Sequence, residues 1–302
     1  MRRSRPTAGP AVPIGVWLKT AKLIGTLEQQ REDTVPITVE TKPGHIYGAW
    51  QQPVNKWQGL PNSIHTDAVA EKVGMRGGTI PGSVHLGHFR PILDQLFGER
   101  WLKSCAISMY YTFATVDREE VRAVVKAPPA GASDALMDAW VETKEGKVVA
   151  KGSLSVGKPS GTPYVSSLPL EQAKPGSNRI LSRMTVGAEF PADGNFVMAE
   201  GENGVVRDPV EMFRALRIVF PDLLNQPVVG FFGASEVVLH DGPIKTGVPY
   251  RKTGKVICVG DSNKTEFAWF QSYLHDQSGK LIASMRHLNR WMKVSSPLWK
   301  AA

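Results

Sequence analysis

The chain has 302 residues, 42% hydrophobic and 21% charged, which is the balance of a globular protein with a sizeable core and a length of about two domains. Its net charge of +8 favours an anionic partner, but no Lys/Arg run or aromatic-basic repeat follows the first few residues, so we expect no nucleic acid partner. No stretch reaches the roughly 18 apolar residues of a membrane span, and we expect a cytoplasmic protein.

Residues 1–30 are predicted to form an N-terminal arm and a short helix, the helix running from about residue 15 to residue 30. The arm is basic, like a targeting sequence, but prolines at positions 6, 10 and 13 interrupt any apolar core, and no cleavage site follows. Further on, PGHIYGAW at 43–50 predicts a turn ahead of the first strand.

The next predicted element is a helical region over about residues 68–97, which is apolar on most of its faces. Asp67 precedes it and is expected to be its N-cap, because a carboxylate there accepts from the N–H groups of the first turn. Pro91 is expected either to kink the helix or to end its first segment. Arg90 and Asp94 are four residues apart and are expected to pair along the helix.

Each half of the chain then carries four strand-like apolar runs, joined by turns that contain glycine or other turn-forming residues. Cys105 and Cys258 lie within such runs, and their spacing indicates buried apolar residues instead of a disulfide or zinc site. The runs cover 105–115, 119–127, 136–144 and 147–157 in the first half and, after a helical segment at 209–220, cover 228–240, 250–263, 265–275 and 280–292, with turns at 144–147, 260–263 and 276–280.

An internal repeat relates the two halves. AWVETKEGKVVA at 139–150 and SYLHDQSGKLIA at 272–283 each have an aromatic residue, a polar turn, Gly-Lys and two aliphatics before an alanine. The repeat predicts a tandem duplication, with an N-terminal unit at 31–157, a linker at 158–178 and a C-terminal unit at 179–302. The expected fold is therefore α+β, with an antiparallel sheet wrapped around a central helix in each unit. This resembles the double hot-dog fold.

A motif in the first half resembles the MaoC-like, (R)-specific enoyl-CoA hydratase family. The motif is NSIHTD, followed by Ala and Gly four residues apart and then by Ile-Pro-Gly. The family shows D-x-N-P-x-H, a short helix and a glycine that opens the central helix. The resemblance implies that His65 is the catalytic histidine, that Asn62 is the family's asparagine and that Gly82 opens the helix. Two positions depart from the pattern: Ser63 replaces a proline, and Leu60 stands where the family's catalytic aspartate belongs.

The chemistry of these residue types fits the resemblance. A histidine has a pKa near 6.5 and can accept or donate a proton at neutral pH, although His65 could equally be a polar residue bonded to backbone ahead of a helix. Gly82 and Ser83, at a helix N-terminus, could bind the enolate oxygen with their N–H groups. His85 and His88 share a helix face, and we expect His85 to reach the same site. They lack carboxylate or cysteine partners at ligand spacing, so we expect no metal.

The sequence therefore predicts a lyase, a hydratase or dehydratase acting on an acyl thioester of CoA or acyl carrier protein, or on a related conjugated carbonyl. Such chemistry belongs to fatty acid metabolism and needs no cofactor, although coenzyme A is expected as part of the substrate. A thioesterase and a non-catalytic acyl-binding protein are the alternatives. The second half has no comparable motif and is expected to be non-catalytic. The chain could be a monomer, in effect a pseudo-dimer, or a homodimer.

Overall fold

The structure is a computed structural model that describes residues 39–218, 224 and 228–299. The chain divides into two units, Met1–Ile37 and Thr38–Ala302, and every described residue belongs to the second unit. The predicted arm and short helix at 1–30 lie outside the described residues. None of the helices in the described part of the chain is long and apolar enough to span a membrane.

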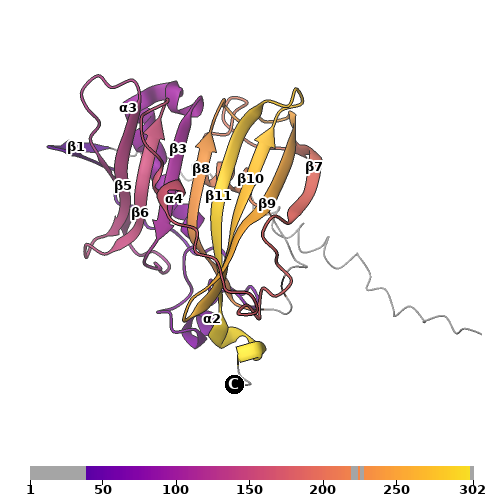
Figure 1. The fold of residues 1–302 in the computed structure, drawn as a ribbon. Coiled ribbons are helices and arrows are strands. Elements are labelled where there is room, and N and C mark those ends of the chain that lie inside the picture. The colour runs from indigo at the N-terminus through magenta and orange to yellow at the C-terminus, as the bar shows by residue number, and fades with distance from the viewer. Residues whose placement is uncertain (1–38, 219–223, 225–227, 300–302) are drawn as a thin grey trace, which may run out of the picture. The chain divides into compact units, whose positions relative to one another are not determined.

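One antiparallel sheet of 11 strands forms the body of the described unit, in the order β1-β2-β4-β5-β6-β3-β8-β11-β10-β9-β7 (Figure 1). The strands of the two halves meet where β3 pairs with β8, with Ser108 opposite Glu236. Outward from this junction, β3-β6-β5-β4 on one side corresponds to β8-β11-β10-β9 on the other. The strands are β1 (Glu40–Lys42), β2 (His45–Tyr47), β3 (Cys105–Tyr111), β4 (Val121–Lys126), β5 (Ala135–Thr143), β6 (Val148–Val156), β7 (Glu189–Val197), β8 (Gly230–Leu239), β9 (Pro249–Asp261), β10 (Thr265–His275) and β11 (Leu281–Met292).

Each of the eight apolar runs overlaps one strand of this sheet, with starts that agree to within two residues, which confirms those predictions. Three further strands, β1, β2 and β7, were not predicted. Pro43 and Gly44 do form a turn, as expected, but the turn joins β1 to β2, and β2 is itself a strand that pairs with β4. The segment at 43–50, which contains this turn and β2, is short and polar on one side. Too few residues alternate in it for periodicity to identify a strand.

The internal repeat corresponds to two hairpins with the same register. Val141 pairs with Ala150 across β5 and β6, and Leu274 pairs with Ala283 across β10 and β11. These pairs are related by the same offset of 133 residues as the two sequence segments. In both hairpins the register shifts at the next residue toward the turn, and the glycine of each turn has a positive φ. The two halves therefore repeat one structural unit down to the position of a β-bulge.

The helical region predicted at 68–97 is not continuous. A short helix, α2 (Asp67–Lys72), ends where Gly74 takes a φ of 81°. A loop follows, then the 3₁₀ helix η1 (Gly82–Phe89), which leads directly into α3 (Arg90–Phe97) and η2 (Gly98–Leu102). Pro91 lies in the first turn of α3, where its missing N–H costs no helical hydrogen bond. It therefore ends one segment and starts the next, which was one of the two expected outcomes.

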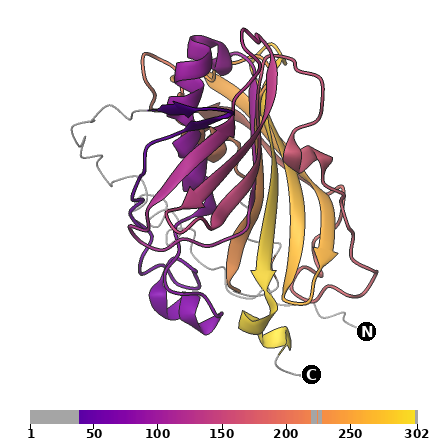
Figure 2. The same ribbon diagram turned by 90° about the vertical axis from the view of Figure 1, so that its left-hand side faces the viewer.

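The central helices of the two halves contact each other. Figure 2 shows η1 and α3 on one face of the first-half strands, and η1 also contacts β8 and α5 (Pro209–Leu216) of the second half. A Cβ added to Gly87 would lie 3.1 Å from Cγ2 of Val210, so the two helices approach closely at this glycine. The structure also contains α4 (Tyr164–Ser167), inside the predicted linker, and the 3₁₀ turns η4 (Lys293–Ser295) and η5 (Pro297–Trp299). The predicted domain boundaries themselves stay predictions.

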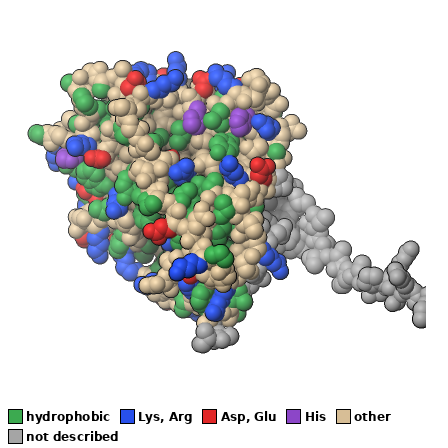
Figure 3. Space-filling view, viewed as in Figure 1, with side chains coloured by type: hydrophobic (Ala, Val, Ile, Leu, Met, Phe, Trp, Pro, Cys, Tyr) green, Lys and Arg blue, Asp and Glu red, His purple; other side chains and the backbone are tan. Residues whose placement is uncertain are grey.

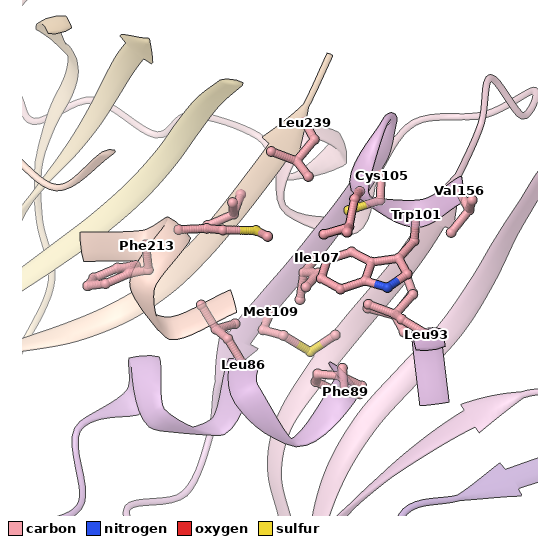
Figure 4. Packing of buried hydrophobic residues seen from close by; sticks show 14 of the residues in the cluster. Leu86, Phe89, Leu93, Trp101, Cys105, Ile107, Met109, Val156, Phe213 and Leu239 are labelled. Atoms are coloured by element: carbon pink, nitrogen blue, oxygen red, sulfur yellow. The ribbon is translucent and has the colours of Figure 1, made fainter. Parts of the chain in front are cut away.

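One large apolar core cluster contains residues of both halves (Figure 4). Trp101, Phe89 and Leu86 from the first half are fully buried together with Phe213 of α5 and Leu239 of β8. Burial of each such side chain contributes about 1.5–3 kcal/mol, so the shared core ties both halves into one unit. Both cysteines are free and buried in strands, as predicted.

Candidate functional site

His65 lies in the loop ahead of α2, and its ring is hydrogen-bonded to backbone. Its Nδ1 is 2.7 Å from the carbonyl oxygen of Thr79. Because a carbonyl oxygen only accepts, we assign the ring proton to Nδ1, which leaves the Nε2 lone pair available. Burial lowers the pKa of His65, the bond to Thr79 raises it, and the charge of Arg217 lowers it further, with a net shift below 6.5. The imidazole is therefore neutral at pH 7 and can accept a proton.

The loop that holds His65 is fixed from several sides. The side-chain amide of Asn55 donates to the carbonyl of His65 at 2.8 Å, and the N–H of Thr79 donates to Ile64. A Cβ at Gly78 would lie 2.4 Å from the same His65 carbonyl oxygen, so only glycine fits at that position. The glycine pair in GMRGGT thus serves close backbone packing beneath the histidine.

Asp67 is not the N-cap of α2, contrary to the prediction. Thr66 occupies the N-cap position, and the Asp67 carboxylate accepts a hydrogen bond from the N–H of Gly78 at 2.6 Å. This bond, followed by one from Gln58, lowers the pKa of Asp67. The prediction was wrong because the loop at 73–81 folds back over the helix start and supplies a nearer donor.

The two remaining motif positions, Asn62 and Leu60, are exposed. Asn62 has a φ of 54°, the left-handed conformation that asparagine tolerates in a turn. The side chain of Leu60 is apolar, and its carbonyl accepts from the Thr66 hydroxyl at 2.9 Å. In the described ranges, no hydrogen bond joins the His65 ring to a carboxylate. The catalytic assignment of Asn62 stays a prediction.

Gly82 is the first residue of η1, as the motif predicted for a helix-opening glycine. The N–H of Val84 donates to Pro81, whereas those of Gly82 and Ser83 have no partner within the part of the chain that the structure describes. Three peptide units separate Thr79 from Gly82, which limits the distance between their Cα atoms to about 11 Å. The partner of His65 and the tip of η1 therefore belong to one short segment. The assignment of Gly82 and Ser83 as an oxyanion site stays a prediction.

His85 and His88 are both buried, and their ring centroids lie 5.4 Å apart. Nε2 of His85 is 3.0 Å from the hydroxyl of Thr115, and Nδ1 of His88 is 3.0 Å from Oε1 of Gln51. Burial holds the pKa of His85 well below its usual range and lowers that of His88 to about 4. No group of three potential metal ligands occurs among residues 39–218, 224 and 228–299. The substrate-binding assignment of His85 stays a prediction.

Sequence reasoning missed a cluster from the second half, formed by Phe213, Phe232 and His287. The His287 ring packs edge-on against Phe232 at 4.7 Å and against Phe213 at 5.2 Å between centroids. Its Nδ1 is 3.0 Å from the Ser235 hydroxyl, and its Nε2 is 3.0 Å from Oδ1 of Asn289. Burial, followed by the charge of Arg217, lowers its pKa to about 3, so this histidine is neutral.

Ser63 connects the His65 loop to this cluster, because it forms an isolated parallel bridge with Gly230 at the start of β8. His65 and Phe232 each lie two residues further along their segments. Arg217, at the end of α5, holds its guanidinium 5.4 Å above the Phe232 ring. No sequence signal could have found these neighbours, since they come from segments more than a hundred residues apart in the chain.

No family model matches the chain, and no curated protein matches it. Solved structures do match. The dehydratase domain of PpsC from Mycobacterium tuberculosis, in complex with C12:1-CoA, has a TM-score of 0.50 at 11% identity, with 86% of this chain and 100% of that chain covered. The fold is a double hot-dog. A conserved hypothetical protein from M. tuberculosis that has a double hotdog fold gives a TM-score of 0.47 at 11% identity, covering 74% and 85% of the two chains. The tesB protein of Mycobacterium avium subspecies paratuberculosis gives 0.46 at 13% identity, covering 90% and 98%.

Two surface hollows of this double hot-dog lie away from His65. One, of about 260 Å³, is lined by Cys105, Lys158 and His240 among others, and one of about 580 Å³ by Lys264 and Arg290 among others. Neither has His65 or Gly82 in its lining. Lys and Arg side chains are spread over the face drawn in Figure 3 and do not form one patch there. On that face, the positive charge of the chain is dispersed.

Proposed function

We propose that the chain is a hydratase or dehydratase of the MaoC-like type that acts on an acyl thioester of CoA or an acyl carrier. The observation that carries the proposal is the bond from Nδ1 of His65 to the Thr79 carbonyl, which leaves Nε2 as a free base in a neutral ring. The sequence motif and the shared fold with an acyl-CoA-bound dehydratase domain also support it.

In the direction of dehydration, Nε2 of His65 takes the C2 proton of a 3-hydroxyacyl thioester. The enolate that forms places its negative charge on the thioester oxygen, where the N–H groups of Gly82 and Ser83 stabilise it. The imidazolium then returns its proton to the C3 hydroxyl as the C3–O bond breaks, and water leaves. Hydration of the enoyl thioester follows the same steps in reverse.

This mechanism uses one residue for both proton transfers, which suits the sequence. Leu60 replaces the aspartate that would share the work, and the described residues offer the His65 ring no carboxylate partner. A single imidazole suffices when the proton removed from C2 and the hydroxyl that leaves from C3 lie on the same side of the acyl chain. We therefore expect a syn elimination, which deuterium placed stereospecifically at C2 can follow.

The test is a panel of enoyl-CoA substrates, followed by loss of absorbance of the conjugated double bond. His65→Ala and His65→Gln are expected to lower kcat/KM by about 100- to 10,000-fold. His45→Ala is the matched control, because His45 lies on β2 and packs against Trp140 on the face opposite the buried Ile46. Equal rates for wild type and His65→Ala would contradict the proposal. Release of free thiol in the same reactions would indicate a thioesterase instead.

A further inference from the structure

Arg217 differs from three other arginines of the described residues in its lack of an ion pair. Arg90, Arg207 and Arg122 each form an ion pair with a carboxylate at 2.5–2.9 Å. Within the ranges that the structure describes, the Arg217 guanidinium has neither a carboxylate partner nor a hydrogen-bond acceptor. Arg217 is exposed as a residue, but the protein around it removes part of its hydration, which lowers its pKa.

Several contacts hold Arg217 in place. Its N–H donates to the carbonyl of Phe213, which closes the last turn of α5. Its own carbonyl accepts from the Nζ of Lys252 at 3.3 Å. The guanidinium lies over the ring of Phe232, which in turn packs against Phe213 at 5.4 Å between centroids. The backbone and the stem of the side chain are therefore fixed, while the donors of the guanidinium have no acceptor among the residues that the structure describes.

The position of Arg217 relates it to His65. Ser63 bridges to Gly230, so the loop that carries His65 runs beside the first residues of β8, where Phe232 lies. The charge of Arg217 acts on both His65 and His287. Arg217 lies over the Phe232 ring at 5.4 Å, and Phe232 packs against His287 at 4.7 Å between centroids, so the guanidinium belongs to the cluster beside this loop.

We propose that Arg217 binds an anionic oxygen group of the ligand, a carboxylate or a phosphate, beside His65. The inference rests on the proposed function in that it takes the ligand of Arg217 to be the substrate of His65. Among the described residues the guanidinium has no counter-ion, and its planar fork of donors matches a carboxylate or phosphate bound in bidentate geometry. Stacking on Phe232 uses the face of the guanidinium and leaves its N–H donors at the edge, where they can bind an anion.

The two sources of the anion are a carboxylate on the acyl chain and a phosphate of the carrier. Four probes that cannot react separate them: the S-pentyl and S-carboxybutyl thioethers of CoA and of pantetheine. The two tails have the same number of carbons, and pantetheine lacks the phosphates of CoA. Kd is measured by calorimetry for the wild-type protein and for Arg217→Gln and Arg217→Lys. Arg214→Gln is the matched control, since Arg214 lies one turn earlier in α5, is exposed and pairs with Glu211.

Loss of one charged hydrogen-bond pair is expected to raise Kd about 10- to 100-fold. If Arg217→Gln weakens only the two carboxybutyl probes, the ligand carries a carboxylate on its acyl chain. If it weakens only the two CoA probes, Arg217 binds a phosphate. Partial recovery in Arg217→Lys supports either assignment. The proposal is overturned if each of the four probes has the same Kd for Arg217→Gln as for Arg214→Gln. It is also overturned if the wild type binds none of the probes.

The outcome is separable from that of the proposed function. If turnover depends on His65 and is unchanged in Arg217→Gln, the proposed hydratase function stands and the proposed anion site is wrong. If binding depends on Arg217 in a protein without turnover, the anion site stands and the hydratase function is wrong. Thermal unfolding of each variant tests whether loss of the Phe232 contact destabilises the protein. If loss of that contact, and not of the charge, weakens binding, Arg217→Lys should raise Kd as much as Arg217→Gln does.

Discussion

Gly82 lies directly against the ring of Tyr111, and a Cβ at this position would come within 2.9 Å of Cδ2 and Cε2 of that ring. The hydroxyl of Tyr111 is buried, and burial raises its pKa well above its usual value. The first residue of η1 is therefore a glycine for reasons of space. The contact fixes the tip of the helix against β3, next to the segment that bonds His65.

Gly82→Ala is expected to destabilise the protein by about 1–3 kcal/mol, because the ring or the helix tip must move to admit the methyl group. The same shift should displace the Gly82 and Ser83 amides. We therefore expect the loss in kcat/KM, expressed as a free energy, to exceed the loss in unfolding free energy. Gly194→Ala is the matched control, since a Cβ there meets nothing within 4 Å and φ is not positive. Urea unfolding and enoyl-CoA turnover measure the two effects. An unchanged Gly82→Ala variant would contradict the packing argument.

Leu60→Asp is expected to raise hydratase activity, because it restores the acid that the related motif carries at this position. The Leu60 side chain is 39% exposed, so an aspartate there can remain solvated and the fold should tolerate it. If the carboxylate shares in proton transfer, the gain in kcat/KM could reach about 100-fold. Leu60→Asn has the same size without the charge and is the control. Equal activity of both variants and the wild type would show that position 60 does not face the reacting atoms.

The pH dependence of kcat/KM should report His65. The pKa of His65 is lowered from 6.5, and the base form is the neutral one, so activity should be constant above pH 6.5 and fall only at lower pH. Arg217→Gln removes a positive charge that lowers this pKa, so its acid limb should move to higher pH. Initial rates between pH 4.5 and 8 provide the measurement, in which a shift of about half a pH unit can be resolved. A limb that is unmoved in Arg217→Gln would show that this charge does not reach His65.

The buried histidines predict a stability that falls in acid. The pKa of His88 is lowered to about 4 and that of His287 to about 3, from 6.5. Above pH 6.5 both are neutral in the folded and unfolded chains, and their contribution is complete. As the pH falls from 6.5 toward these values, only the unfolded chain takes up protons, so each histidine lowers the unfolding free energy by about 1.4 kcal/mol per pH unit. Urea unfolding at several pH values should show this slope, and His88→Gln should reduce it. An identical slope in His88→Gln would contradict the assignment.

Much of the fold could be predicted from the sequence because the relevant signals are local. Eight apolar runs and three turns were each identified from a few neighbouring residues, and the Gly-Lys repeat placed both hairpins. The short strands β1 and β2 and the irregular β7 were missed, because too few residues alternate in each of them for periodicity to appear. The helical region over 68–97 is interrupted, since glycines at 74, 77 and 78 lie in the loop that separates α2 from η1 and α3.

The candidate site was only partly predictable, because its contacts are not local. The motif identified His65, but its partner, the Thr79 carbonyl, is a backbone atom that no residue type indicates. Asp67 has the side chain and position of an N-cap, and only the return of the loop explains why it bonds Gly78 instead. Arg217 is one arginine among many in the sequence. Its place over Phe232, without an ion pair among the described residues, becomes visible only when β8 and α5 are brought together.

The pairing of Arg90 with Asp94 was predicted within one helix, but the structure gives Asp94 a wider role. Its carboxylate accepts from Nε1 of Trp101 at 2.7 Å, from Arg207 of the second half at 2.9 Å and from Arg90 at 3.3 Å. Asp94→Ala leaves three donors without their acceptor, and we expect a loss of about 1–3 kcal/mol in unfolding free energy. Glu99→Ala removes a carboxylate that is 73% exposed and whose ion pair is with Arg207, so its effect should be about 0–1 kcal/mol. A double-mutant cycle between Asp94 and Arg207 measures how far this residue couples the two halves, and zero coupling energy would show that the shared apolar core does so without it.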